Sequence, residues 1–169
     1  DGIVMRVMDG LMSIPPILLA IAMMALTRAS VQNVIIAITI AEIPRVARLV
    51  RGVVLSLREQ PYVDAAIASG TRTPVIIWRH ILPNSLTPVL AFLPFRISGA
   101  VLALTSLDFL GLGVPASQAS LGELLSQGKD NLDAWWIGLS TVGTLTIMLL
   151  LLVMIGEGLR QAFDVRIRS

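Results

Sequence analysis

The sequence contains no cysteine and a single histidine, and only 14% of its 169 residues are charged. Without cysteine, the chain can form neither a disulfide framework nor a thiolate metal site. The histidine, His80, has no second ligand near it in the sequence, so we expect no metal site. A soluble domain usually has about a quarter of its residues charged. Because 55% of this chain is hydrophobic and the apolar residues form long runs, the sequence predicts a membrane protein.

Several kinds of chemistry lack the residues that they need. The net charge is only +2 and the basic residues are scattered among apolar runs, so nucleic acid is not an expected partner. The sequence has no GxxxxGK[ST] loop for phosphates and no acidic magnesium site beside one. A Ser–His hydrolase within the membrane is disfavoured because His80 lies in a loop. We therefore expect a chain that is not an enzyme and binds no cofactor of its own.

Four apolar segments predict an all-α, polytopic fold with about four transmembrane helices. About 20 apolar residues cross the roughly 30 Å of hydrocarbon in a bilayer. The segments are residues 11–27, 31–50, 85–107 and 134–155. The second is apolar only in its first half, and four charged residues then follow at a spacing of three residues: Glu42, Arg45, Arg48 and Arg51. This pattern predicts a helix that leaves the membrane, with its arginines reaching the headgroups.

The distribution of basic residues predicts the orientation. If the loop between the second and third segments is cytoplasmic, all but three of the 13 Lys and Arg residues lie on the cytoplasmic side. The exceptions are Arg28 and Lys129 on the opposite side and Arg96 within the third segment. Both ends of the chain are then cytoplasmic as well. Because residue 1 is Asp and no leader precedes the first apolar run, we expect a piece of a longer protein.

The loop at residues 57–84 is predicted to fold as two short helices. Pro61 suits a first helical position, and Gly70 suits the left-handed residue that ends a helix. Thr73 is expected to cap a second helix, which should stop by Pro83. Alanines at positions 65, 66 and 68 favour the first helix and leave its surface free of bulky side chains.

Two interpretations of this loop stay open. It could be a connector that packs against the ends of its own membrane helices. It could instead be a docking element, because small residues let another protein come close while Tyr62, Ile67 and Trp78 supply area to bury.

The order Asp64-Ala65-Ala66, Gly70, then His80-Ile81-Leu82-Pro83 resembles the cytoplasmic EAA loop of bacterial ABC importer permeases. The general pattern has Glu first and Ile where His80 stands. Further stretches are similar to the dipeptide/oligopeptide branch: Met5–Ala22, Ala47–Glu59, Arg79–Asn84, Phe109–Gly113 and Gly156–Arg166. Two departures are Leu104, where the family commonly has Glu, and Asp108, where Ser is usual.

The resemblance implies a type I ABC importer transmembrane domain in a multi-pass protein of the bacterial inner membrane. Residues 1–169 would form a single permease domain that lacks the N-terminal spans. Residues 57–84 would be its coupling loop. The implied partners are ABC ATPase subunits that bind ATP and magnesium, a second and non-identical permease, a periplasmic or lipoprotein substrate-binding protein, and membrane lipid.

The resemblance also implies roles for single residues. Asp64 would contact the ATPase, Ala65 and Ala66 would allow it to approach, and Gly70 would form a turn where a side chain would clash. The remaining residues of the coupling set are His80, Ile81, Leu82 and Pro83.

Two charged residues of the third segment are candidates for the substrate pathway. Arg96 is unfavourable in hydrocarbon unless it faces water or a partner, so it could line the pathway or contact a companion helix. Asp108 could meet the amino terminus of a peptide or cap a turn at Gly111. The cargo stays open among dipeptides, oligopeptides, microcins, glutathione and nickel. The alternative function is an ion-coupled secondary transporter, which Arg96 and proline-broken spans would also suit.

Overall fold

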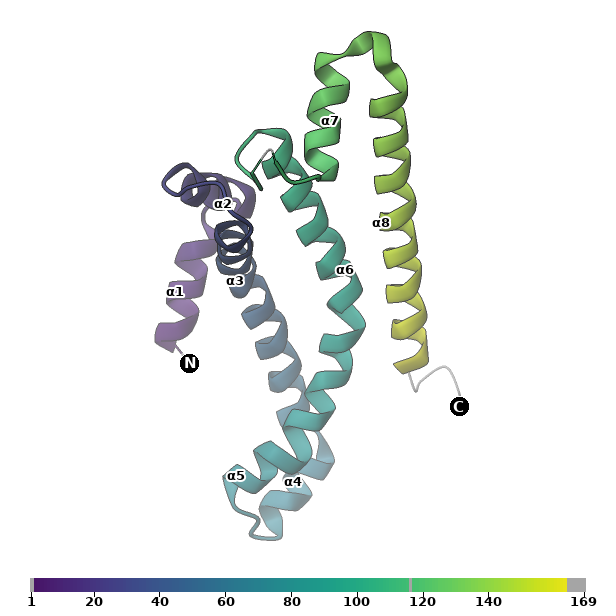
Figure 1. Ribbon diagram of the computed structural model, residues 1–169. Helices are drawn as coiled ribbons and strands as arrows, with labels where there is room; N and C mark the ends of the chain where they lie inside the picture. The colour runs from purple at the N-terminus through teal and green to yellow at the C-terminus, as the bar shows by residue number, and fades with distance from the viewer. Residues whose placement is uncertain (1, 116, 164–169) are drawn as a thin grey trace.

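The computed structural model describes residues 2–115 and 117–163, and every regular element within them is helical. Figure 1 shows the elements in chain order. They are α1 (Gly2–Met12), α2 (Pro16–Ala25), α3 (Val31–Arg58), α4 (Pro61–Ala68), α5 (Thr73–Ile76), η1 (Ile77–Ile81), α6 (Leu82–Phe109), α7 (Leu121–Asp130), η2 (Leu132–Ala134) and α8 (Trp135–Phe163). The all-helical fold predicted from the sequence is confirmed.

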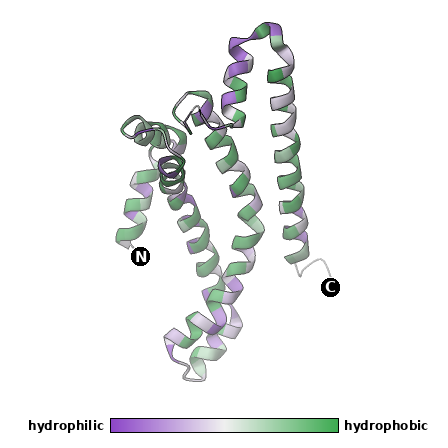
Figure 2. Ribbon diagram, viewed as in Figure 1, coloured by the Kyte–Doolittle hydropathy of each residue, from purple (hydrophilic) through white to green (hydrophobic). Residues whose placement is uncertain are grey.

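Helix α6 is the centre of the bundle. It packs against α3 and also against α7 and α8. The short helices α4 and α5 lie at one end of the molecule, and the connection between α7 and α8 lies at the opposite end (Figure 1). Hydrophobic residues dominate α6 and α8, whereas the end that carries α4 and α5 is mixed (Figure 2). The loop at residues 57–84 therefore projects from the end of an apolar bundle.

Two segments of the described residues are long and apolar enough to cross a membrane: Thr73–Phe109 and Leu132–Phe163. They contain the third and fourth predicted spans. The second predicted span lies in α3, which has 28 residues but carries Glu42 near its middle and several arginines in its second half. Because those charges lower its hydropathy, the role of α3 as a fourth span stays a prediction.

The first predicted span, residues 11–27, is not one straight helix. It is divided between α1 and α2, which meet at an angle of 79°. Pro16 is the first residue of α2, where its missing N–H removes no helical hydrogen bond. The two helices would make a third membrane crossing if the bent pair forms one span.

The prediction that the second loop helix stops by Pro83 is wrong, because helical structure runs without a break from α5 through η1 into α6. η1 is a π-helical turn, in which the N–H of Leu82 donates to the carbonyl of Ile77. A proline ring inside an α-helix clashes with the carbonyl four residues earlier. We attribute the continuity to the wider π turn, which displaces that carbonyl. The same helix therefore belongs both to the loop and to a membrane span.

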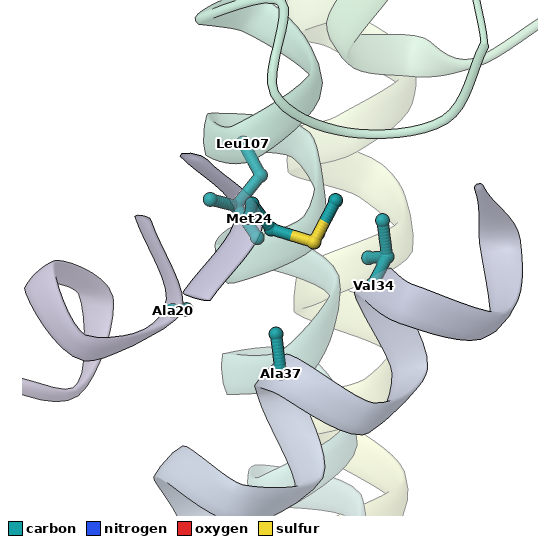
Figure 3. Packing of buried hydrophobic residues seen from close by; sticks show 5 residues of the cluster. All are labelled: Ala20, Met24, Val34, Ala37 and Leu107. Atoms are coloured by element: carbon teal, nitrogen blue, oxygen red, sulfur yellow. The ribbon is translucent and has the colours of Figure 1, made fainter. Parts of the chain in front are cut away.

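The main buried cluster lies where α2, α3 and α6 meet. Its members are Ala20, Met24, Val34, Ala37 and Leu107. Figure 3 shows these side chains converging from the three helices. Leu104 packs against the same cluster, so its side chain serves the core. This cluster packs α6, which carries the candidate pathway residues Arg96 and Asp108, against α2 and α3.

Candidate coupling loop and pathway residues

The turn between α4 and α5 is a Schellman motif. The N–H of Gly70 donates to the carbonyl of Ile67 at 2.9 Å, and the N–H of Thr71 donates to the carbonyl of Ala66 at 3.1 Å. Gly70 has φ +74°, which confirms the predicted left-handed residue. Pro61 is the first residue of α4, also as predicted. Thr73 is the first residue of α5 and not its cap, so that boundary shifts by one residue.

The reason for a glycine at position 70 differs from the expected one. No heavy atom lies within 4 Å of the position that a Cβ would occupy, so a side chain would not clash. The left-handed backbone conformation instead costs an ordinary residue roughly 1–2 kcal/mol. Gly70 is therefore required by its dihedral angle and not by close packing.

A small apolar cluster holds the loop together. Val63 on α4 and Ile76 and Ile81 on the following helix are buried against one another. Val54 of α3 and Ala66 of α4 pack against them. Fully burying one side chain of this size contributes about 1.5–3 kcal/mol. The two short helices consequently form one unit with the end of α3.

The outer surface of the loop remains apolar in part. Trp78 is 71% exposed, and Tyr62 and Ile67 are exposed as well. The rings of Tyr62 and His80 lie 6.3 Å apart, which links α4 to the π turn. Such exposed aromatic and aliphatic side chains on packed helices suit a docking element.

The structure separates the eight predicted coupling residues into two groups. Four are exposed: Asp64, Ala65, Gly70 and Pro83. Ala66, His80 and Leu82 are half-buried, and Ile81 is buried. The second group therefore supports the loop from within. The coupling role of both groups stays a prediction.

Sequence reasoning missed the buried residues Val63 and Ile76. The spacing of Val63 and Ala66, three residues apart, was an available helical signal. Ile76 and Ile81 are five residues apart, which does not match an α-helical face. Both are buried because the π turn lies between them.

Arg96 is joined to α3 by an ion pair. Its Nη1 lies 3.5 Å from Oε2 of Glu42, and the other oxygen of Glu42 lies 3.3 Å from Nη1 of Arg45. Glu42 thus stands between two guanidinium groups. The expected contact of Arg96 with a companion helix is present, and its place in a substrate pathway stays a prediction.

A second ion pair joins α1 to α3. Nη2 of Arg48 lies 2.6 Å from Oδ1 of Asp9. Arg45 and Arg48, which we expected to reach lipid headgroups, therefore pair with acidic groups of the bundle. The two ion pairs with Asp9 and Glu42 therefore bring charged side chains of α1, α3 and α6 into one region.

Asp108 is only 5% exposed, and its carboxylate belongs to a turn. Its Oδ1 accepts a hydrogen bond of 2.8 Å from the N–H of Val114. Gly111 has φ +72°, and its N–H donates to the Asp108 carbonyl. This geometry agrees with the expected capping of the turn at Gly111. The alternative contact with a peptide's amino terminus stays a prediction.

Within the described ranges 2–115 and 117–163, no group of three or more His, Cys, Asp or Glu side chains is placed to hold a metal ion.

Comparison with known proteins gives one consistent family. The sequence family described as "Binding-protein-dependent transport system inner membrane component" matches residues 1–169. A putative peptide transport system permease protein of Brucella suis is 48% identical over 99% of this chain and 57% of its own length. A probable peptide ABC transporter permease protein of Sinorhizobium fredii is 42% identical over 98% of this chain and 57% of its own length. A dipeptide transport system permease protein of Alkalihalophilus pseudofirmus is 39% identical over 100% of this chain and 56% of its own length. The chain therefore spans little more than half the length of these relatives.

Proposed function

Because the chain belongs to the family of binding-protein-dependent transport system inner membrane components, we propose that it acts as a permease subunit of an ATP-driven importer. The proposed cargo is a peptide, a di- or oligopeptide or a similar solute, since relatives are named peptide and dipeptide permeases. The names of these relatives favour this function over an ion-coupled secondary transporter.

The observation that carries the proposal is the construction of the loop at residues 57–84. It is a pair of short helices packed on one apolar cluster, and its second helix continues directly into α6. A displacement of the outer surface of the loop would therefore be transmitted to a membrane helix directly, because no non-helical segment lies between them. This is the property that a coupling element requires when the energy source is a separate subunit.

The proposed assembly follows from this role. Two ATPase subunits bind ATP and magnesium and close on one another, and one of them moves the loop. Exposed Asp64 and Ala65 lie in its contact surface, and half-buried Ala66, His80 and Leu82 support that surface. The loop and both chain ends face the cytoplasm. A second, non-identical permease and a substrate-binding protein complete the importer.

Because these 169 residues contain no cysteine, thiol crosslinking from this segment can test the proposed assembly. In the full-length protein within its assembled complex, Tyr62→Cys and Ala65→Cys would each introduce a cysteine into this segment. We expect both variants to form a crosslink to the ATPase subunit with a short bifunctional thiol reagent. Val142→Cys on the exposed side of α8 is the matched control and should not form one. Equal crosslinking by all three variants, or labelling of positions 62 and 65 only from outside the cell, would overturn the proposal.

A further inference from the structure

Three arginines from two helices line one open cavity. The cavity has a volume of about 510 Å³ and is lined by Met12, Arg45, Arg48, Leu49 and Arg96. No acidic side chain is among these lining residues. We call Arg45, Arg48 and Arg96 the arginine cluster.

The arginine cluster carries more positive charge than its neighbours neutralise. Among the residues that the structure describes, its three guanidinium groups pair with two carboxylates, those of Asp9 and Glu42. Each pair engages a single nitrogen of the arginine, and a guanidinium has five N–H donors. About half of the Arg48 side chain remains exposed. The cavity therefore offers both net positive charge and unused donors to an anionic group.

The position of the cluster argues against a lipid headgroup as its usual ligand. Arg96 lies midway along the 28 residues of α6. At a rise of 1.5 Å per residue, it is about 20 Å from either end of that helix. Lipid phosphates lie outside the roughly 30 Å hydrocarbon layer, whose half-thickness is about 15 Å. A solute that passes between the helices would reach Arg96 more directly.

We propose that the arginine cluster binds a carboxylate of the transported solute during its passage. For a peptide, the ligand group would be the terminal carboxylate. A planar guanidinium binds a carboxylate with two parallel hydrogen bonds. Several arginines in one cavity can bind the same carboxylate one after another as the solute moves. This inference rests on the proposed function, because it takes the solute to be an imported peptide.

The test compares import of a tripeptide with import of the same tripeptide as its C-terminal amide. The complete full-length importer is reconstituted in liposomes, with loaded binding protein at saturation, so that the maximal import rate is measured. We expect Arg48→Gln and Arg96→Gln to reduce import of the free acid by about tenfold or more, since a hydrogen bond to a charged group contributes about 1.5–3 kcal/mol. Import of the amide should stay within about twofold of the unsubstituted importer.

Two control variants separate anion binding from structural damage. Asp9→Asn breaks the same ion pair as Arg48→Gln but keeps the guanidinium, so it should retain import of the free acid. Arg96→Lys keeps a positive charge and should retain more import than Arg96→Gln. If the unsubstituted importer does not carry the amide, the difference between Arg96→Lys and Arg96→Gln in import of the free acid still decides the outcome.

The inference is overturned if the Gln variants import the free acid normally, or if they lose both peptide forms equally while Arg96→Lys gives no rescue. It is also overturned if the defect occurs only in liposomes that contain phosphatidylglycerol, because the cluster would then bind a lipid phosphate. An unsubstituted importer that carries neither peptide form contradicts the proposed function itself, which is a separate result.

Discussion

The loop at residues 57–84, at one end of the molecule, and the arginine cluster, midway along α6, are built in different ways. The loop takes its shape from neighbours in the sequence: Pro61 begins a helix, and Gly70 turns the chain. The arginine cluster is instead held by ion pairs between residues far apart in the sequence. Asp9 of α1 pairs with Arg48 of α3, and Glu42 of α3 pairs with Arg96 of α6.

This difference has a consequence for substitution. A change in the loop should impair coupling and leave the packing of the spans intact. A substitution in the buried core of α2, α3 and α6 should disturb the arginine cluster. It should leave the loop folded, because Val63, Ile76 and Ile81 form a separate apolar cluster. The four predictions below test this separation, from the largest expected effect to the smallest.

Gly70→Asp should abolish transport while the protein stays inserted in the membrane. The substitution places a charged side chain at φ +74° in the exposed turn between the two loop helices. We expect substrate-stimulated ATP hydrolysis by the reconstituted complex to fall at least tenfold. The causes are the backbone strain, roughly 1–2 kcal/mol, and the charge added at the proposed contact surface. Gly52→Asp, at an exposed helical glycine of α3, is the control and should retain coupling. Normal substrate-stimulated ATP hydrolysis by the Gly70→Asp complex would contradict the proposed coupling role of this turn.

Leu107→Ala should disturb the core that positions the arginine cluster. Leu107 of α6 is fully buried against α2 and α3 (Figure 3), so its truncation leaves a cavity. Substitutions of this kind cost about 2–5 kcal/mol, and we expect a lower melting temperature of the purified complex. Leu150→Ala, on the exposed face of α8, should change the melting temperature little. Equal effects of the two substitutions would contradict the importance of this core.

Substitution of Asp108 should have a smaller effect on stability, and it distinguishes a role in the turn from a role in the substrate pathway. Asp108→Ala removes the acceptor of the part-buried Val114 N–H, so we expect a cost toward the lower end of the about 1–3 kcal/mol of an unsatisfied buried donor. Asp108→Asn keeps an oxygen acceptor, so it should retain both the melting temperature and transport. If Asp108→Asn melts normally but transports poorly, the carboxylate charge itself is needed and the pathway role regains support.

Ser30→Ala should give the smallest effect. The Ser30 hydroxyl accepts a hydrogen bond of 3.1 Å from the N–H of Asn33 at the start of α3. Loss of such a cap costs about 1 kcal/mol. The melting temperature should fall slightly, and substrate-stimulated ATP hydrolysis should be unchanged. A loss of coupling in this variant would mean that the two regions are not separate.

Much of the loop could be predicted because its signals are local. A proline at a helix start and a glycine in the left-handed conformation act on their own backbone, so Pro61 and Gly70 were correctly assigned. Pro83 was wrongly taken as a stop, because a single proline does not reveal whether a preceding π turn relieves its clash. The ion pairs of Arg48 and Arg96 could not be predicted, since their partners lie 39 and 54 positions away along the chain.

The sequence by itself determined that the chain is helical and apolar, and where its charges fall along it. These properties follow from each residue's own hydrophobicity and backbone preferences. Only the tertiary structure decided that Asp9 meets Arg48, that Glu42 lies between Arg45 and Arg96, and that three arginines share one cavity. The reason is that packing of the buried α2–α3–α6 core fixes which helix faces which, and periodicity within one helix carries no information about its neighbour.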